Sequence, residues 1–240
     1  MAHPPVNELK YKGFLYFEKI ISTLSHDTIN AFSVINEMAG LQQDILEDPT
    51  EGAAIDAEEL AAICVKIRAH VQRGKTAIRG INWITHRADQ PEAMTDINET
   101  IEKISEITNM WLDTRRAKLA FTPLKAAIGI QTKPFFFAFA VLLSIDMLTA
   151  VSSSVPQVVT VGYCTAEDRH EFLITNRNYE SRLSREADKW ATLASLMGVL
   201  GGTIKHPTDN TSSTNHLLLC LPKRSITEAN ELTRSTKEVQ

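Results

Sequence analysis

The stretch from Phe17 to Ile45, FEKIISTLSHDTINAFSVINEMAGLQQDI, decides the fold. Its mainly apolar inward positions recur in alternating steps of four and three, a heptad-type spacing that places them on one side of a long α-helix. We predict a helix over about residues 7–46. Its buried seam should consist of Phe17, Ile21, Leu24, Thr28, Ala31, Ile35, Met38, Gln42 and Ile45. A second apolar set widens this stripe and favours a bundle of four helices, namely Phe14, Ile20, Phe32 and Leu41.

A second helix of the same kind follows a break that contains Pro49 and Gly52. Asp56 and Glu59 have the spacing of a capping box, and the helix should end near His86. The predicted seam is Leu60, Cys64, Ile67, Val71, Gly74, Ile78 and Ile81. A two-helix hairpin over residues 7–90 has too little to bury alone, so we predict a homodimer with a four-helix bundle at its centre.

The pattern changes after Pro91. We expect helices over residues 96–118, 133–151 and 184–199, and strands near residues 118–121, 158–163, 171–175, 201–204 and 216–221. Helices combined with an antiparallel-type sheet predict an α/β sandwich over residues 91–222, so the whole chain belongs to the α+β class. The polar tail over residues 223–240 is expected to be disordered.

Composition excludes several classes of protein. A net charge of −4 gives no overall signature of nucleic-acid binding, so we expect no nucleic-acid partner. Three widely spaced cysteines form neither a disulfide framework nor a metal motif, which favours a reducing cytoplasm. The most apolar run, residues 135–151, contains Asp146 and indicates a buried core helix rather than membrane insertion. No histidine spacing predicts a metal site.

The first helix carries one candidate reactive group, His26, with Asp27 beside it and Asn30 one turn later. Residues four apart share a helix face, so His26 and Asn30 should be neighbours on the flank of the seam. A neutral imidazole is a good nucleophile toward a phosphoryl group, and a neighbouring carboxylate can orient it and accept its proton. The alternative reading is an ordinary surface histidine with polar neighbours.

Antiparallel pairing predicts basic neighbours for His26 on the second helix. Lys75 and Arg79 lie about as far after the interhelical break as His26 lies before it, and Arg73 is close to them in sequence. These cations are candidates for stabilising a phosphoryl group or steering an acidic partner. For any single one of them, a solvated basic face is an equally good explanation.

Four segments together resemble the core of a bacterial histidine kinase. Leu24-Ser25-His26-Asp27 looks like the phosphoacceptor box, and Asp96-Ile97-Asn98-Glu99 resembles the opening of the catalytic domain. Residues 142–151 are similar to the helix that bears the N box, and residues 193–204 resemble the last helix with its following strand. The resemblance covers residues 10–222 and implies a dimerisation hairpin followed by an ATPase-like domain.

The sequence departs from this family where the family holds its nucleotide. Ser144 and Leu148 stand at the places of the N-box asparagines, and a leucine cannot ligate magnesium. The segment over residues 175–179 has neither the adenine-reading Asp nor the glycines of the first glycine box. No glycine occurs between Tyr179 and Met197, where the family has a second glycine box. ATP binding is therefore not expected.

This combination resembles the dimeric histidine phosphotransferases, which look like kinases without nucleotide binding. The resemblance implies a phosphorelay in which His26 passes phosphoryl groups between the aspartates of response-regulator receiver domains. Asp27 would orient His26, Asn30 would serve receiver dephosphorylation, and Mg²⁺ would come from the receiver. The implied docking surface consists of Phe32, Ser33, Asn36 and Ala39 with the facing part of the second helix.

Two other functions stay open at this point. The chain is alternatively a divergent ATP-dependent histidine kinase, which saturable binding of magnesium-ATP would support. It is alternatively a non-catalytic scaffold that binds a receiver domain, in which case binding would be insensitive to mutation of His26.

Overall fold

The computed structural model describes residues 5–47, 57–112, 115–149, 156–176, 187–205 and 215–223. The chain divides into two compact units. One consists of residues 18–83, and the other of residues 1–17 together with residues 84–240. Asp56 of the predicted capping box and the predicted tail beyond Lys223 lie outside the described residues.

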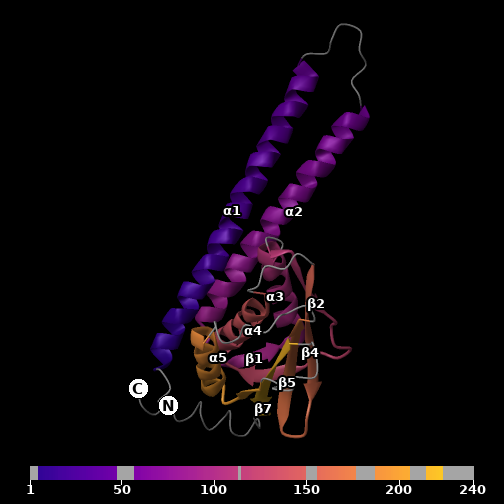
Figure 1. Cartoon of the computed structure of the whole chain (residues 1–240). Helices are drawn as coiled ribbons and strands as arrows, with labels where there is room; N and C mark the ends of the chain where they lie inside the picture. Colours follow the sequence, from indigo (N-terminus) through magenta and orange to yellow (C-terminus); the bar gives the residue numbers. More distant parts are fainter. Residues whose placement is uncertain are drawn as a thin grey trace. The chain divides into compact units, whose positions relative to one another are not determined.

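The first unit is a pair of long helices, drawn in Figure 1 as the indigo and magenta ribbons. Helix α1 spans Val6–Glu47 and helix α2 spans Ala57–Ala88, close to the predicted bounds. The predicted seam of α1 is confirmed for this unit. Leu24 and Ala31 are buried, and the remaining seam positions from Ile21 to Ile45 are half-buried. His26 is exposed, as its place on the flank of the seam predicts.

The predicted seam of α2 is wrong at every second position. Cys64, Val71 and Ile78 are exposed, whereas Ile63 and Ala77 are buried. Two apolar stripes lie side by side on this helix, and both repeat every seven residues. The stripe that faces α1 is buried or half-buried and consists of Leu60, Ile63, Ile67, His70, Gly74, Ala77 and Ile81. The predicted positions Leu60, Ile67, Gly74 and Ile81 are therefore confirmed.

The second unit is built on a five-stranded sheet with the strand order β2-β4-β5-β7-β6. Its strands are β2 (Ala117–Phe121), β4 (Gln157–Thr165), β5 (Arg169–Asn176), β6 (Thr203–Lys205) and β7 (Asn215–Pro222). Strands β4, β5, β7 and β6 pair antiparallel, and β2 pairs parallel with β4. The sheet is therefore mixed, whereas an antiparallel-type sheet was expected.

Three helices lie beside this sheet in Figure 1, namely α3 (Ile97–Leu112), α4 (Pro134–Thr149) and α5 (Ala187–Val199). Alternate sheet residues such as Val159, Phe172 and Leu219 are buried, which is the pattern of a sheet covered on one face. The architecture is thus the predicted α+β arrangement of a helical hairpin followed by an α/β sandwich.

Helix α4 is the core of the second unit, since all sixteen of its residues are buried. One side of α4 packs on the sheet, where Phe137 meets Phe172 with ring centroids 5.1 Å apart. The first turns of α1 cover α4 with an aromatic cluster, in which Phe14 and Phe17 each lie 5.2 Å from the Phe135 ring. This double cover explains why α4 is apolar on every side.

Two local predictions for the second unit are corrected. The helix expected to reach residue 118 ends at Leu112, and Arg116, with a φ of 52°, precedes strand β2. No glycine or proline marks this end, so the sequence gives no clear stop signal for the helix. The short antiparallel pair β1 (Ala93–Asp96) and β3 (Gly129–Thr132) was not predicted, because four-residue strands show little periodicity.

Among the described residues, no helix has both the length and the hydropathy that crossing a membrane requires.

Candidate functional site

The His26 side chain lies on the exposed flank of α1 and pairs with Asn30 one turn later. Asn30 Nδ2 is 3.1 Å from His26 Nδ1. The helix itself sets this contact, because residues i and i+4 stand above one another on one face. The predicted neighbourhood of these two residues is therefore present, and His26 Nε2 is the ring nitrogen that Asn30 leaves open.

Asp27 points toward α2 and forms an ion pair with Arg73, whose Nη2 lies 3.0 Å from Asp27 Oδ2. The side chain of Asp27 is 15% exposed and that of Arg73 is 54% exposed. The two helices meet closely here because small residues face each other, and a Cβ placed on Gly74 would lie 3.8 Å from Ala31 Cβ. Arg73 is thus the predicted cation that the structure brings to the His26-Asp27 pair.

The other predicted site residues lie on the same two helices. Lys75 and Arg79 are exposed on α2, and Phe32, Ser33, Asn36 and Ala39 are exposed on α1. The hydroxyl of Ser33 donates a hydrogen bond to the carbonyl of Ile29. Ile29 is 64% exposed and Phe32 57% exposed, so two large apolar side chains stand close to His26 in the sequence. Ile29 was missed because its exposure depends on the helix pairing.

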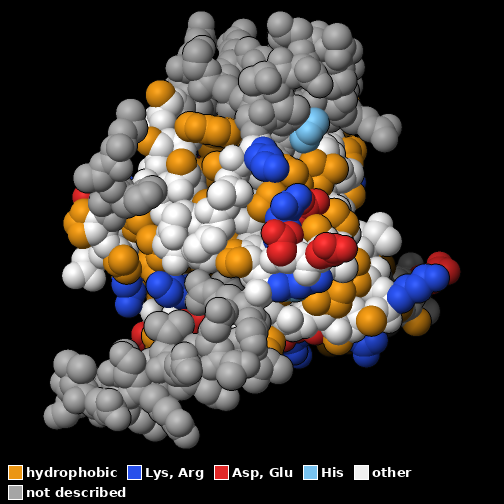
Figure 2. Space-filling model, turned by 90° about the horizontal axis from the view of Figure 1, so that it is seen from below, with side chains coloured by type: hydrophobic (Ala, Val, Ile, Leu, Met, Phe, Trp, Pro, Cys, Tyr) orange, Lys and Arg blue, Asp and Glu red, His pale blue; other side chains and the backbone are white. Residues whose placement is uncertain are grey.

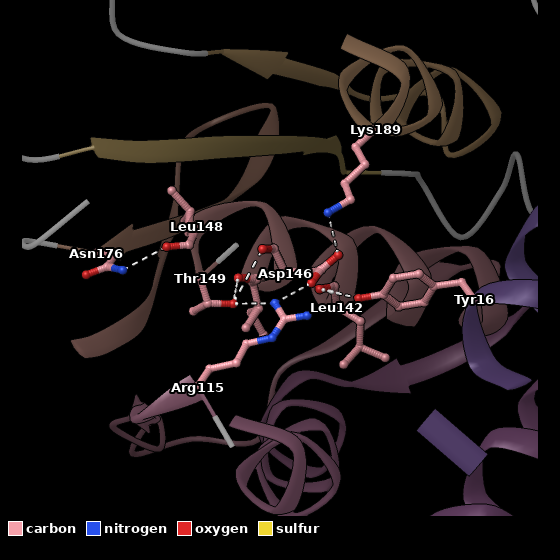
Figure 3. A network of polar contacts seen from close by, with 9 residues as sticks. Tyr16, Arg115, Leu142, Asp146, Leu148, Thr149, Asn176 and Lys189 are labelled. Carbon is pink, nitrogen blue, oxygen red and sulfur yellow. Dashed lines mark hydrogen bonds and ion pairs between the residues drawn. The ribbon is translucent and has the colours of Figure 1, made fainter. Parts of the chain in front are cut away.

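In the second unit, the residues at the expected nucleotide-binding positions use their polar groups internally. Ser144 is fully buried, and its Oγ donates to the carbonyl of Ala140 at 2.7 Å. Leu148 is buried, and its carbonyl accepts a hydrogen bond from Asn176 Nδ2 at 2.7 Å (Figure 3). The same Nδ2 donates to Gln157 Oε1 at 2.8 Å. Ser144 and Asn176 thus direct these hydrogen bonds to other protein groups, and the Leu148 side chain carries no oxygen that could ligate magnesium.

Asp146 lies at the centre of an ion network on the same helix (Figure 3). Its two carboxylate oxygens contact Arg115 Nη1 at 2.7 Å and Lys189 Nζ at 2.9 Å. The Arg115 guanidinium lies 4.1 Å from the centroid of the Trp111 ring. The Asp146 side chain is 7% exposed, and a carboxylate this buried requires such partners. A lone Asp in an apolar run is the sequence signal from which this network could have been inferred.

Tyr16 from the start of α1 lies at the edge of this network (Figure 3). Its hydroxyl donates to the carbonyl of Leu142 at 3.2 Å. Burial raises the pKa of Tyr16 well above its ordinary value, and the negative charge of Asp146 raises this pKa further. The phenol therefore stays protonated and acts as a fixed hydrogen-bond donor.

A second group of titratable residues lies where strands β4 and β5 meet their turn. Arg169 Nε contacts Glu171 Oε1 at 2.6 Å, and this hydrogen bond lowers the pKa of Glu171. Cys164 Sγ donates a hydrogen bond to Glu171 Oε2 at 3.3 Å. Burial is the main cause that raises the pKa of this thiol, and the hydrogen bond to Glu171 raises it further. These charges neutralise one another. The face seen in Figure 2 likewise shows acidic and basic side chains side by side among hydrophobic ones.

No group of three or more His, Cys, Asp or Glu side chains that could hold a metal occurs in the part of the chain that the structure describes.

Comparison with known proteins gives matches only among solved structures. No protein-family model matches the chain, and no curated protein sequence matches it. The histidine kinase AdeS of Acinetobacter baumannii is 12% identical, with a TM-score of 0.46 over 78% of this chain and 96% of that chain.

Two further matches cover smaller shares of this chain. The cytoplasmic segment of histidine kinase QseC is 12% identical with a TM-score of 0.43, covering 62% of this chain and 93% of that chain. The ATP-binding domain of PrrB from Mycobacterium tuberculosis is 16% identical with a TM-score of 0.43. That match covers 57% of this chain and 100% of the PrrB domain.

Proposed function

We propose that this protein is a histidine phosphotransferase that carries phosphoryl groups on His26 between aspartates of receiver domains. The single observation behind the proposal is the arrangement around His26. An exposed imidazole on a helical hairpin stands beside a carboxylate, a carboxamide and an arginine. These are the groups that a phosphoryl transfer uses for attack, orientation and charge stabilisation.

The transfer begins at a receiver whose aspartate carries the phosphoryl group. A ring nitrogen of His26 attacks phosphorus, and the bond from phosphorus to the aspartate oxygen breaks. The electron pair of that bond stays on the receiver carboxylate, and the phosphoryl group stays on the imidazole. A second receiver aspartate then attacks the same phosphorus and releases His26. The receiver's own acidic pocket would supply Mg²⁺ to both steps.

The polar contacts inside the second unit support a phosphoryl donor other than ATP. Ser144 and Asn176 direct their hydrogen bonds to other protein groups, and Leu148 offers no side-chain ligand. A kinase reaction by this chain would require magnesium and nucleotide phosphates to be held there. The proposed cycle needs neither group to be held by this chain, because the receiver supplies Mg²⁺ and its acyl phosphate already carries the transferable group.

A homodimer is part of the proposal. Large apolar side chains remain exposed on both helices of the hairpin, including Ile29, Phe32, Val65, Val71 and Ile78. Soluble proteins rarely leave so many apolar residues on one element without a partner surface. A second copy of the hairpin would cover part of this set and form a four-helix bundle. The exposed residues nearest His26 would remain for receiver docking.

Transfer from a charged receiver tests the proposal directly. Receiver domains from the same organism would be charged with radiolabelled acetyl phosphate, freed of the reagent and mixed with the wild type or His26→Gln. We expect acid-labile label on the wild type and none on His26→Gln, with both proteins folded to the same extent by circular dichroism. Equal labelling of both proteins would show that His26 is not the acceptor.

A further inference from the structure

The four groups around His26 form two separate pairs. Asn30 is paired with His26, and Asp27 is paired with Arg73 across the hairpin. Within the described residues, Asp27 makes no hydrogen bond to His26, although it is the next residue in the chain. The carboxylate that could orient the imidazole is therefore held by the other helix.

The His26-Asn30 contact favours one position of the ring proton. In this arrangement the Asn30 amide nitrogen faces His26 Nδ1, and because an amide nitrogen donates, Nδ1 accepts the hydrogen bond. In the neutral ring the proton then lies on Nε2. The lone pair of Nδ1 is occupied by Asn30, and Nε2 has no lone pair to offer. In this arrangement neither ring nitrogen presents a free lone pair to a phosphorus atom.

Attack through the open nitrogen, Nε2, requires the proton to move to Nδ1 and an acceptor to hold it there. Asp27 is the nearest anion along the chain, but Arg73 must release it first. The Arg73 side chain is 54% exposed, and only one of its five N–H donors contacts Asp27. A phosphoryl dianion entering the site offers the guanidinium more charge and more acceptors than one carboxylate does.

We propose that Arg73 is a positioning residue that holds Asp27 away from His26 until the phosphoryl group of an aspartyl phosphate displaces it. Asp27 then accepts a hydrogen bond from Nδ1, and the lone pair appears on Nε2. Nε2 attacks phosphorus, the bond to the acyl oxygen breaks, and its electron pair stays on the donor carboxylate. Asp27 balances the positive charge of the phosphorylated ring. The inference rests on the proposed function, since it concerns the state of the same histidine.

The tautomer of His26 tests this inference without any phosphoryl transfer. The full chain would be labelled with ring-¹⁵N histidine, and the ring nitrogens of His26 would be observed by NMR in the neutral state, assigned with His26→Gln. We expect the lone pair on Nδ1 in the wild type and on Nε2 in Arg73→Gln, where Asp27 is free. Arg68→Gln removes an exposed charge from the same helix and should resemble the wild type.

A double variant separates positioning from a merely structural effect. In Arg73→Gln combined with Asp27→Asn, no carboxylate is available, so the lone pair should return to Nδ1. Inorganic phosphate added to the wild type should shift the lone pair toward Nε2, whereas chloride at equal ionic strength should not. The inference would be overturned if Arg73→Gln left the tautomer of His26 unchanged. It would also be overturned if the tautomer changed equally in Arg73→Gln and in the double variant that lacks the Asp27 carboxylate. Failure of receiver transfer would instead count against the proposed function, because the tautomer is measured without a receiver.

Discussion

At the scale of single residues, contacts within one helix were predictable from the sequence. Contacts between the two helices were not, because they depend on the register of one helix against the other. His26 and Asn30 are four residues apart, so their contact follows from the helix repeat. The partner of Asp27 depends on the register between α1 and α2, and the loop between the predicted helices does not fix that register. The sequence therefore indicated three cations, and only the structure selects Arg73 as the partner of Asp27.

Two helical glycines of α1 give a residue-scale prediction with an internal control. A Cβ on Gly13 would lie 2.7 Å from Phe135 Cε1, and Phe135 is only 3% exposed and held by its aromatic neighbours. Gly13→Ala should lower the free energy of unfolding by about 1 kcal/mol or more, because overpacking outweighs the gain in helix propensity. Urea unfolding followed by circular dichroism measures this change.

Gly40→Ala is the matched control, since a Cβ at that position meets nothing within 4 Å. It should raise the free energy of unfolding by roughly 0.5–1 kcal/mol through helix propensity alone. If both variants stabilised the protein equally, the tight contact between the start of α1 and helix α4 would not exist.

At the scale of helices and strands, long periodic segments were predicted well, and short or packing-dependent ones were not. The bounds of α1, α2, α4, β4 and β5 lie within two residues or so of the expected ranges. The end of α3 was missed because residues 113–118 contain neither glycine nor proline, so the sequence carries no clear stop signal there. The parallel pairing of β2 leaves no mark in the strand's own sequence.

The two stripes of α2 show where one sequence pattern supports two interpretations. Residues of both stripes repeat every seven positions, and burial assigns one of them to contact with α1. The other stripe, Cys64, Val71 and Ile78, is apolar without being buried in a single chain. A helix that must face two different neighbours needs both stripes, which is the arrangement expected in a dimeric four-helix bundle.

Val71→Glu tests the dimer at this scale. Val71 is 41% exposed in the single chain, so a charge there can be hydrated in a monomer and would be buried unpaired in a bundle. We expect light scattering at micromolar concentration to report a dimer for the wild type and a monomer for Val71→Glu. Met94→Glu changes another exposed apolar residue, in strand β1, and should remain a dimer. A monomeric wild type would contradict the proposal.

At the scale of the whole molecule, the chain combines a helical hairpin that exposes a candidate nucleophile with an α/β sandwich that contains a buried ion network. The ion network of Asp146, Arg115 and Lys189 links α4, α5 and the segment before β2 within the second unit. Breaking such a buried network by removing one partner is costly, which favours a single rigid arrangement of these elements.

The measurement that tests this account most directly is incubation of the full chain with radiolabelled magnesium-ATP. It would be run beside incubation with a radiolabelled phosphorylated receiver, and acid-labile phosphate would be counted on the wild type and on His26→Gln. The account predicts label on wild-type His26 from the receiver and none from ATP. Label from ATP on the wild type but not on His26→Gln would contradict it and show that the chain is a kinase.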